Sequence, residues 1–448
     1  MIAGLEALFE DGGRAMLHEG GLGETWSDAL AHVPAAVVDP ERAEDGGTDP
    51  VGVRALVRLR EFWSQQHDLQ PALASTKALI RWYAVNRGPE HPDTVVELST
   101  FGGLAMRAGR VVEGGQIVEK AWKQLDGKLA ENDLRLAIVA ANAARQFVET
   151  GRLEESARAL GLAHRIRTRQ APGSTGIVAA QLGEVLVMLG RVEQAAPLLV
   201  EAVQRYRAIY GSDHPSTIAR IRQLAAAEQR RGRFAQAVPL WREAWAHLVA
   251  SGDDEGRAAV GFELGVALEQ VGQRAEALRM LEETVRLTRE IGERTGEIDP
   301  ELPTRLAAYA NAEAARGGLG EAEGLLHEAL EAERRISGSS SAEVAGRYAV
   351  LGAFVARTGR IDEAIGWLDT AASLLRSNLG DTHPRTHGTV ETLVNLLMQR
   401  AALSLASRDR EYAGVALARA MELAGPVLGH VHEKTRKVRD LREKNRLG

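Results

Sequence analysis

Residues 210–250 read YGSDHPSTIARIRQLAAAEQRRGRFAQAVPLWREAWAHLVA, and this stretch decides the fold. Gly211 supplies the left-handed residue that commonly ends a helix, and Pro215 has the fixed φ that suits the first turn of the next helix. We therefore predict a helix that begins at about Pro215. Apolar and small residues recur at spacings of three and four up to Gly232, and a second such pattern begins near Phe234. The stretch predicts a helical hairpin with one apolar face on each arm.

This hairpin recurs along the chain. The residues equivalent to its turn glycine are Gly109, Gly151, Gly190, Gly232, Gly272, Gly317 and Gly359, at successive steps of 42, 39, 42, 40, 45 and 42 residues. A single hairpin cannot bury its apolar face, whereas a stack of hairpins can. A repeat of this length with two helical arms therefore predicts a solenoid.

Small residues stand at two fixed offsets from each turn glycine. Seven residues before it stand Gly102, Ala144, Gly183, Ala225, Gly265, Ala310 and Gly352, and five residues after it stand Gly114, Ser156, Ala195, Ala237, Ala277, Ala322 and Ala364. Antiparallel helices approach closely only where the contacting side chains are small. These positions are predicted to be the crossing points of the hairpins.

The Leu-Gly pairs at residues 182–183, 264–265 and 351–352, together with Ala237 and Trp241, resemble the tetratricopeptide repeat. The usual period of that family is about 34 residues, so a period near 42 implies longer helices. The longer period and a recurring Gly, acidic residue, His-Pro, Thr linker resemble the kinesin-light-chain type of repeat. The linkers span residues 88–94, 211–217 and 380–386. The resemblance covers about residues 51–430 and implies an all-α fold.

We predict an all-α, right-handed solenoid, a TPR-like superhelix of about nine antiparallel helical hairpins over residues 51–430. Its first repeat is degenerate, because Arg60 occupies a small-residue position. Residues 431–448 are dense in Lys, Arg and Glu and predict a C-terminal capping helix. Residues 1–50 do not fit the repeat and predict a lead-in of short helices and a flexible linker. A second interpretation is a regulatory segment that folds back into the groove through Leu5, Leu8, Phe9, Trp26 and Leu30.

Composition limits the classes of partner. Lys plus Arg total 55 against 61 for Asp plus Glu, a net charge of −6, which argues against a nucleic-acid-binding surface. No apolar run approaches the length of a membrane span, and the absence of Cys excludes disulfides and thiolate chemistry. We expect a cytoplasmic protein without a membrane or nucleic-acid partner. The predominance of Arg over Lys suggests a bacterial source, and both a monomer and a homo-oligomer remain open.

Histidine is the most plausible candidate for chemistry. His91, His214 and His383 each belong to a different repeat, so they cannot converge on one ion, and we predict that they start helices beside Pro. A weaker interpretation places a metal among Asp381, His383, His387, His430 and His432. No phosphate loop or nucleophile elbow is present. We therefore predict no catalytic residue, no cofactor and no metal, and a protein that is not an enzyme.

The resemblance also implies that the first helix of each hairpin lines the concave side. At the offsets that face inward, the polar candidates for peptide binding are Arg145, Glu184, Arg222, Gln229, Glu269, Asn311 and Arg357. Small apolar residues lie between them: Val148, Val187, Ala226, Val266 and Ala353. Amides can bond an extended backbone while short side chains enter between the helices. The alternative, that these are simply solvent-facing helix positions, stays open.

These observations predict a non-catalytic scaffold that binds a peptide segment or a partner protein along the concave groove. The first alternative is a regulatory sensor, in which a small signalling peptide closes the superhelix and changes an output elsewhere. An enzyme ranks far behind, because no catalytic constellation is present.

Overall fold

The computed structural model describes residues 51–65 and 68–445, and every regular element within them is helical. The α-helices are α3 (Val51–Gln65), α4 (Leu69–Arg87), α5 (Pro92–Arg107), α6 (Val111–Leu125), α7 (Leu134–Glu149), α8 (Leu153–Gln170), α9 (Thr175–Met188), α10 (Val192–Tyr210), α11 (Pro215–Arg230), α12 (Phe234–Ser251), α13 (Asp254–Gln270), α14 (Arg274–Thr295), α15 (Leu302–Ala315), α16 (Leu319–Ser337), α17 (Ala342–Arg357), α18 (Ile361–Leu379), α19 (Pro384–Ala406), α20 (Arg410–Leu428) and α21 (Glu433–Lys444). A short 3-10 helix, η2 (Pro172–Ser174), precedes α9.

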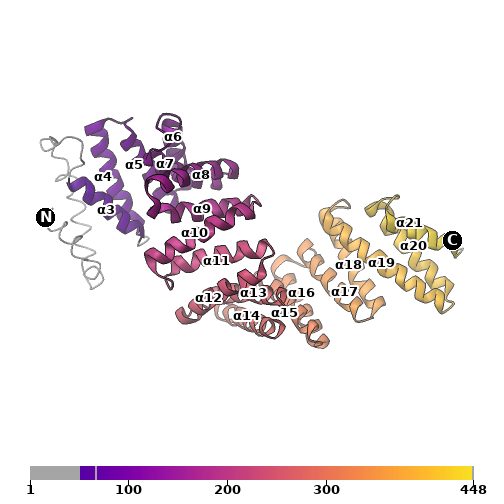
Figure 1. Ribbon diagram of the computed structural model, residues 1–448. Coiled ribbons are helices and arrows are strands. Elements are labelled where there is room, and N and C mark those ends of the chain that lie inside the picture. The colour runs from indigo at the N-terminus through magenta and orange to yellow at the C-terminus, as the bar shows by residue number, and fades with distance from the viewer. Residues whose placement is uncertain (1–50, 66–67, 446–448) are drawn as a thin grey trace. The chain divides into compact units, whose positions relative to one another are not determined.

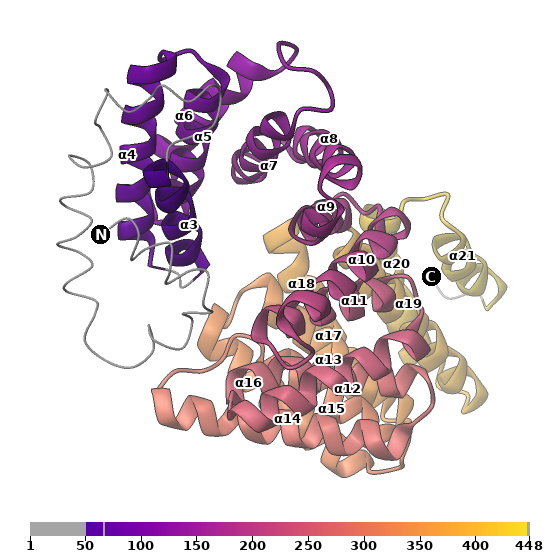
Figure 2. The same ribbon diagram turned by 60° about the vertical axis from the view of Figure 1, so that its left-hand side comes forward.

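The chain forms two compact units, one that ends at Arg231 and one that begins at Gly232. In the first unit α3 pairs with α4, α5 with α6, α7 with α8 and α9 with α10, and α11 packs on α10. In the second unit α12 packs on α13, and four hairpins follow, from α13 and α14 to α19 and α20, before α21 (Figures 1 and 2). The helix starts predicted at Pro215 and Phe234 are the first residues of α11 and α12. The predicted all-α solenoid of stacked hairpins is confirmed.

The predicted turn glycines all adopt the left-handed conformation that side chains disfavour. Their φ angles run from 71° at Gly232 to 96° at Gly317. The last hairpin departs from this rule, because Arg408 takes the turn position with φ 64°. Arg408 is the only non-glycine residue with positive φ in the described part of the chain. The turn geometry is therefore kept even where glycine is absent.

The small residues lie where the two helices of a hairpin cross. A Cβ atom on Gly183 would lie 2.7 Å from Leu199 Cδ2, and one on Gly265 would lie 2.7 Å from Leu281 Cγ. In the hairpin of α7 and α8 the same crossing is made by Ser156, whose hydroxyl donates to the Ala144 carbonyl at 2.9 Å. The crossing has no room for larger side chains, as the sequence pattern predicts.

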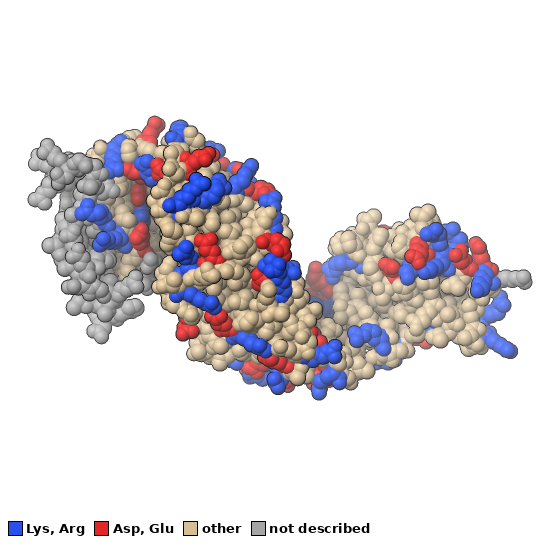
Figure 3. Space-filling model, viewed as in Figure 1, with Lys and Arg blue, Asp and Glu red and all other residues tan. Residues whose placement is uncertain are grey.

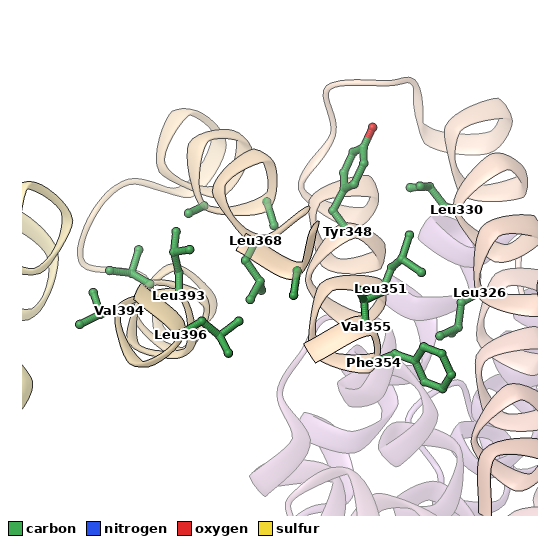
Figure 4. Close-up of a cluster of buried hydrophobic side chains, with 14 of the residues drawn as sticks. Leu326, Leu330, Tyr348, Leu351, Phe354, Val355, Leu368, Leu393, Val394 and Leu396 are labelled. Atoms are coloured by element: carbon green, nitrogen blue, oxygen red, sulfur yellow. The ribbon is translucent and has the colours of Figure 1, made fainter. Parts of the chain in front are cut away.

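In the second unit the hairpins share one apolar core that continues from one repeat to the next. Figure 4 shows part of it, where Leu351 and Phe354 of α17 lie close to Leu326 of α16. Leu368 of α18 and Leu393 of α19 extend the same cluster toward the C-terminus. Because each hairpin completes the core of its neighbour, the stability of a repeat depends on its contacts with the repeats beside it.

The recurring His-Pro-x-Thr linker starts helices. Nδ1 of His91 accepts the backbone N–H of Asp93 at 3.3 Å, and Nδ1 of His214 accepts that of Ser216 at 3.1 Å. His383 caps α19 in the same way. The Thr217 hydroxyl donates to the Gly211 carbonyl at 2.8 Å and closes the preceding turn. The interpretation of these histidines as helix-start residues is confirmed.

Arginines near several of the turns connect a repeat to the one before it. In the first unit Arg191 bonds Glu154 in a bidentate pair at 2.7 and 3.0 Å. In the second unit the Arg360 guanidinium lies 2.7 Å from Glu323, 37 residues earlier. Figure 3 shows the resulting mixture of basic and acidic side chains on the face in view. The charges of these pairs are already satisfied within the protein.

The structure explains how the first repeat accommodates Arg60 at a position where other repeats carry a small residue. Arg60 of α3 forms a hydrogen-bonded ion pair with Glu97 of α5, so the larger side chain is accommodated by a partner in the next repeat. Burial raises the pKa of Glu97, and the nearby Arg60 opposes this shift.

The predicted domain boundaries at residues 50 and 430 stay predictions. Residues 1–50, with the apolar side chains assigned to a regulatory segment, lie outside the described residues. Helix α21 falls within the predicted C-terminal cap, and its Val438 is buried against the last hairpin.

Candidate peptide-binding face

We use the name first-helix face for the exposed side of the first helices of the hairpins, within each unit separately. In the first unit the side chains themselves join these helices. Asn142 of α7 donates to the Ser99 hydroxyl of α5 at 3.1 Å. Gln223 of α11 donates to Glu184 of α9 at 3.4 Å. The first helices therefore present neighbouring stretches of one surface.

The predicted site residues divide between the two units. Arg145 and Glu184 are exposed on α7 and α9, and Arg222 and Gln229 are half-buried on α11. In the second unit Asn311 and Arg357 are exposed on α15 and α17, and Glu269 is half-buried on α13. The Gln223 bond to Glu184 places the candidates of α9 beside those of α11. Their role in binding stays a prediction.

Several of these candidates have no partner. In the described parts of the chain, Arg145, Arg222 and Arg357 form neither an ion pair nor a side-chain hydrogen bond, and neither does Asn311. Glu269 has one carboxylate oxygen, Oε2, that is buried and accepts no hydrogen bond. Polar groups without intramolecular partners are available to a bound chain.

The first-helix face of the second unit also carries apolar side chains. Val266 and Ala353, which the sequence places here, are accompanied by Val350 of α17 and Leu403 of α19, 40% and 50% exposed. Sequence reasoning missed Val350 and Leu403, because it took only the most inward offsets. Val350 stands nine residues before Gly359, at the offset of Asn142 and Gln223, so its spacing would have identified it, whereas the offset of Leu403 from Arg408 carries no such signal. Exposed apolar side chains beside unpaired polar groups are typical of peptide-binding surfaces.

The first unit contains two more exposed apolar residues and a basic residue that the sequence analysis did not include. Ile177 and Met188 of α9 are 53% and 52% exposed. Arg107 lies on α5, the first helix of the hairpin before the one that carries Arg145. Its guanidinium donates to the Ser64 carbonyl at 2.9 Å. The sequence prediction missed Arg107 because its first candidate residue, Arg145, lies one hairpin later. The pKa of Arg107 lies below its usual value, first because of partial burial of the guanidinium and second because of the charge of Arg145.

The second unit also contains two clefts lined by charged residues. One, of about 340 Å³, is lined by residues of α18 and α20, where Arg376 pairs with Asp381 and Arg419 pairs with Asp369, each at 2.7 Å. The other, of about 300 Å³, lies beside the irregular linker before α15 and contains Arg305, which pairs with Asp299 at 2.6 Å. The arginines of both clefts are therefore already neutralised by carboxylates of the same unit.

The residues that the structure describes contain no group of three or more His, Asp or Glu side chains placed to hold a metal ion. None of their helices has the length and apolarity that crossing a bilayer requires.

Two models of the tetratricopeptide-repeat family match the chain. One matches residues 175–244 and the other residues 263–291. In the structure these matches fall on α9 to α12 and on the hairpin of α13 and α14. The matched residues include the turn glycines Gly190, Gly232 and Gly272 and the Leu-Gly pairs at residues 182–183 and 264–265.

Among curated proteins, the chain is similar to the RxLR effector protein SFI4 of Phytophthora infestans (strain T30-4), with 25% identity over 217 residues. The match covers 47% of this chain and 62% of that relative, so the chain spans less than two thirds of the relative's length.

Among solved structures, the apo form of RapI has a TM-score of 0.54 at 11% identity, over 83% of this chain and 97% of that one. The apo form of the quorum sensor NprR from B. thuringiensis also has a TM-score of 0.54 at 11% identity, over 82% and 97% of the two chains. At this identity the likeness concerns the fold alone. The two matches thus assign tetratricopeptide repeats to residues 175–244 and 263–291, and the hairpins on either side repeat the same architecture.

Proposed function

We propose that this protein is a non-catalytic scaffold that binds an extended peptide segment of a partner protein on the first-helix face. The fold and family support a repeat protein that binds proteins or peptides, and the groove assignment is our own inference. The observation that carries it is the set of partnerless polar side chains Arg145, Arg222, Asn311 and Arg357 on that face. A scaffold surface needs such groups, because a peptide backbone must exchange its bonds to water for bonds to protein.

The apolar residues of the same face supply the second requirement. Val350 and Leu403 in the second unit, and Ile177 and Met188 in the first, are large side chains exposed between polar positions. Peptide side chains can lie against them while the neighbouring amides and guanidinium groups bond the backbone or the polar side chains. This alternation favours an extended segment that contacts several successive helices.

Charge reversal tests the proposal. The variant Arg222→Glu with Arg357→Glu is compared with the matched control Arg165→Glu with Arg279→Glu, in which exposed arginines of the second helices α8 and α14 are changed. Partner proteins are captured from lysate on the immobilised full chain and quantified by mass spectrometry. We expect the first variant to lose partners that the control retains, with equal helix content by circular dichroism. Equal capture by both variants would move binding away from the first-helix face.

The sensor alternative remains a second proposal. NprR is a quorum sensor by its own description, and its likeness to this chain extends to the fold alone. A sensor would change its compactness when its peptide binds. Small-angle scattering of the full chain with and without a peptide recovered from the captured partners separates the two proposals. An unchanged radius of gyration favours the scaffold.

A further inference from the structure

One position of the first helices carries a charge in several repeats. Twelve residues before the turn glycine stand Glu97 on α5, Arg220 on α11, Arg305 on α15 and Arg347 on α17. In the other repeats with a turn glycine the same position carries Val139, Val178 and Val260, each at most 1% exposed. The position therefore faces the packed interior of the stack, where a charge needs a partner.

Three of these four charges are neutralised within the protein. Arg347 pairs with Glu333, with Nε 3.0 Å from Oε2. Arg305 pairs with Asp299 at 2.6 Å, and Glu97 pairs with an arginine of the preceding repeat. In each case an ion pair offsets the cost of removing the charge from water.

The fourth charge, that of Arg220, has no such pair. Its guanidinium lies on the ring of Tyr206, 5.5 Å from the ring centroid. Within the described chain it forms neither an ion pair nor a hydrogen bond, and its Nε is buried without an acceptor. Burial raises the pKa of Tyr206, and the Arg220 charge only opposes this shift, so the phenol stays neutral. A half-buried cation is therefore stabilised by a ring face alone, and its two terminal nitrogens remain accessible from outside.

Tyr206 occupies the position of the missing acid. Tyr206 and Glu333 each stand 16 residues after the turn glycine of their own repeat. Thr288 stands at the same offset, and its hydroxyl accepts a hydrogen bond from Arg305 at 2.8 Å. In all three repeats the residue at this offset contacts the charge of the next first helix. The first unit thus has a tyrosine where α16 carries a carboxylate.

The rings of Tyr210 and His214 continue this cluster toward the surface. The ring centroids of Tyr206 and Tyr210 lie 5.5 Å apart, and Tyr210 stacks on His214 at 4.8 Å. Tyr210 is the last residue of α10 and is 39% exposed, and His214 caps α11. Asp213, in the linker between them, forms no ion pair with Arg220 in the described chain. The cluster therefore lies at an edge of the first unit, made by the end of α10 and the start of α11.

We propose that Arg220 binds an acidic side chain of a partner protein at this edge. The partner's carboxylate supplies the negative charge that Glu333 supplies to Arg347. The terminal nitrogens of a guanidinium donate in parallel to the two oxygens of a carboxylate, and partial burial strengthens such a bond. Because the site is built on the contact of Arg220 with α10, it does not depend on the binding of a peptide along the first-helix face.

Two peptide libraries with blocked ends test this assignment. One has the form X4-Glu-X4 and the other X4-Gln-X4, where X is a mixture of uncharged residues. Acetylated and amidated ends leave the glutamate side chain as the single carboxylate. Retention on the immobilised full chain is measured at 50 and 300 mM NaCl. We expect the glutamate library to be retained about fivefold more than the glutamine library at low salt, with a smaller ratio at high salt.

Three single substitutions then locate the site. Arg220→Gln removes the charge, and Tyr206→Glu places a carboxylate beside Arg220 as Glu333 lies beside Arg347. Both variants should lose the preference for the glutamate library. The control Arg165→Gln removes an exposed arginine of α8, with the same change in net charge as Arg220→Gln, and should leave the preference unchanged. Circular dichroism compares the helix content of the three variants.

The assignment is overturned if the unmodified protein retains both libraries equally, or if the preference survives Arg220→Gln. A preference that survives in a folded Tyr206→Glu variant also overturns it, because the internal carboxylate should then occupy the guanidinium. If Tyr206→Glu loses helix content, the comparison of Arg220→Gln with Arg165→Gln decides.

Discussion

The inside of a hairpin and its first-helix face are built under opposite constraints. Inside, Gly352 lies so close to α18 that an added Cβ atom would stand 2.8 Å from Leu368 Cγ. On the first-helix face of the same helix, Ala353 and Arg357 are exposed, and Arg357 has no partner within the described chain. Neighbouring residues of one helix thus serve different purposes. Packing determines the first set, whereas we propose that the second set contacts another molecule.

The strongest test of this contrast is a change inside the crossing. Gly352→Leu should destabilise the protein by about 1–3 kcal/mol, because the larger side chain must displace Leu368 and Trp367. The matched control is Gly366→Leu on α18, where a Cβ atom meets nothing within 4 Å. Urea denaturation followed by circular dichroism measures both. Equal stability of the two variants would contradict the close crossing.

The turns offer a reciprocal pair of changes. Arg408→Gly should stabilise the protein by about 1 kcal/mol, because glycine adopts the positive φ of this turn without strain. Gly359→Arg should lower stability by a similar amount, because its φ of 85° is unfavourable for a side chain. Thermal unfolding of both variants is the measurement. A loss of stability in Arg408→Gly would mean that the Arg408 side chain is itself needed.

The ion pairs between repeats should matter less. A double-mutant cycle on Arg191 and Glu154, each replaced by Ala, should give a coupling of about 0.2–1 kcal/mol, because the pair is bidentate but exposed. The coupling should fall as NaCl is raised. A coupling that does not depend on salt would contradict the electrostatic account.

The smallest effect on stability is expected on the first-helix face. Arg145→Glu should leave the free energy of unfolding within about 0.5 kcal/mol of the unmodified protein, because the side chain has no intramolecular partner. Urea denaturation checks this expectation. A larger loss would show that Arg145 takes part in the packing of α7.

The two regions also differ in how well the sequence predicts them. The turn glycines, the crossing residues and the starts of α11 and α12 follow from backbone geometry and residue size, which recur in seven successive repeats from Gly109 to Gly359. Arg408 is near a predicted turn, but its positive φ and the pair of Arg60 with Glu97 were not foreseen, because each depends on its own surroundings. The candidate binding residues are harder to predict from the sequence. Their offsets come from the repeat, but the absence of partners around Arg145 and the hydrogen bond of Arg107 to the Ser64 carbonyl appear only in three dimensions.

The most direct test of the proposed binding face is site-specific photo-crosslinking. A benzophenone amino acid is placed at Glu184 or Asn311 on first helices and, as controls, at the exposed Arg165 or Arg279 on second helices. After irradiation with cell extract, we expect the same partner to be crosslinked from positions 184 and 311 and not from positions 165 and 279. Crosslinks to that partner from the second-helix positions alone would contradict the central claim that the first-helix face binds it.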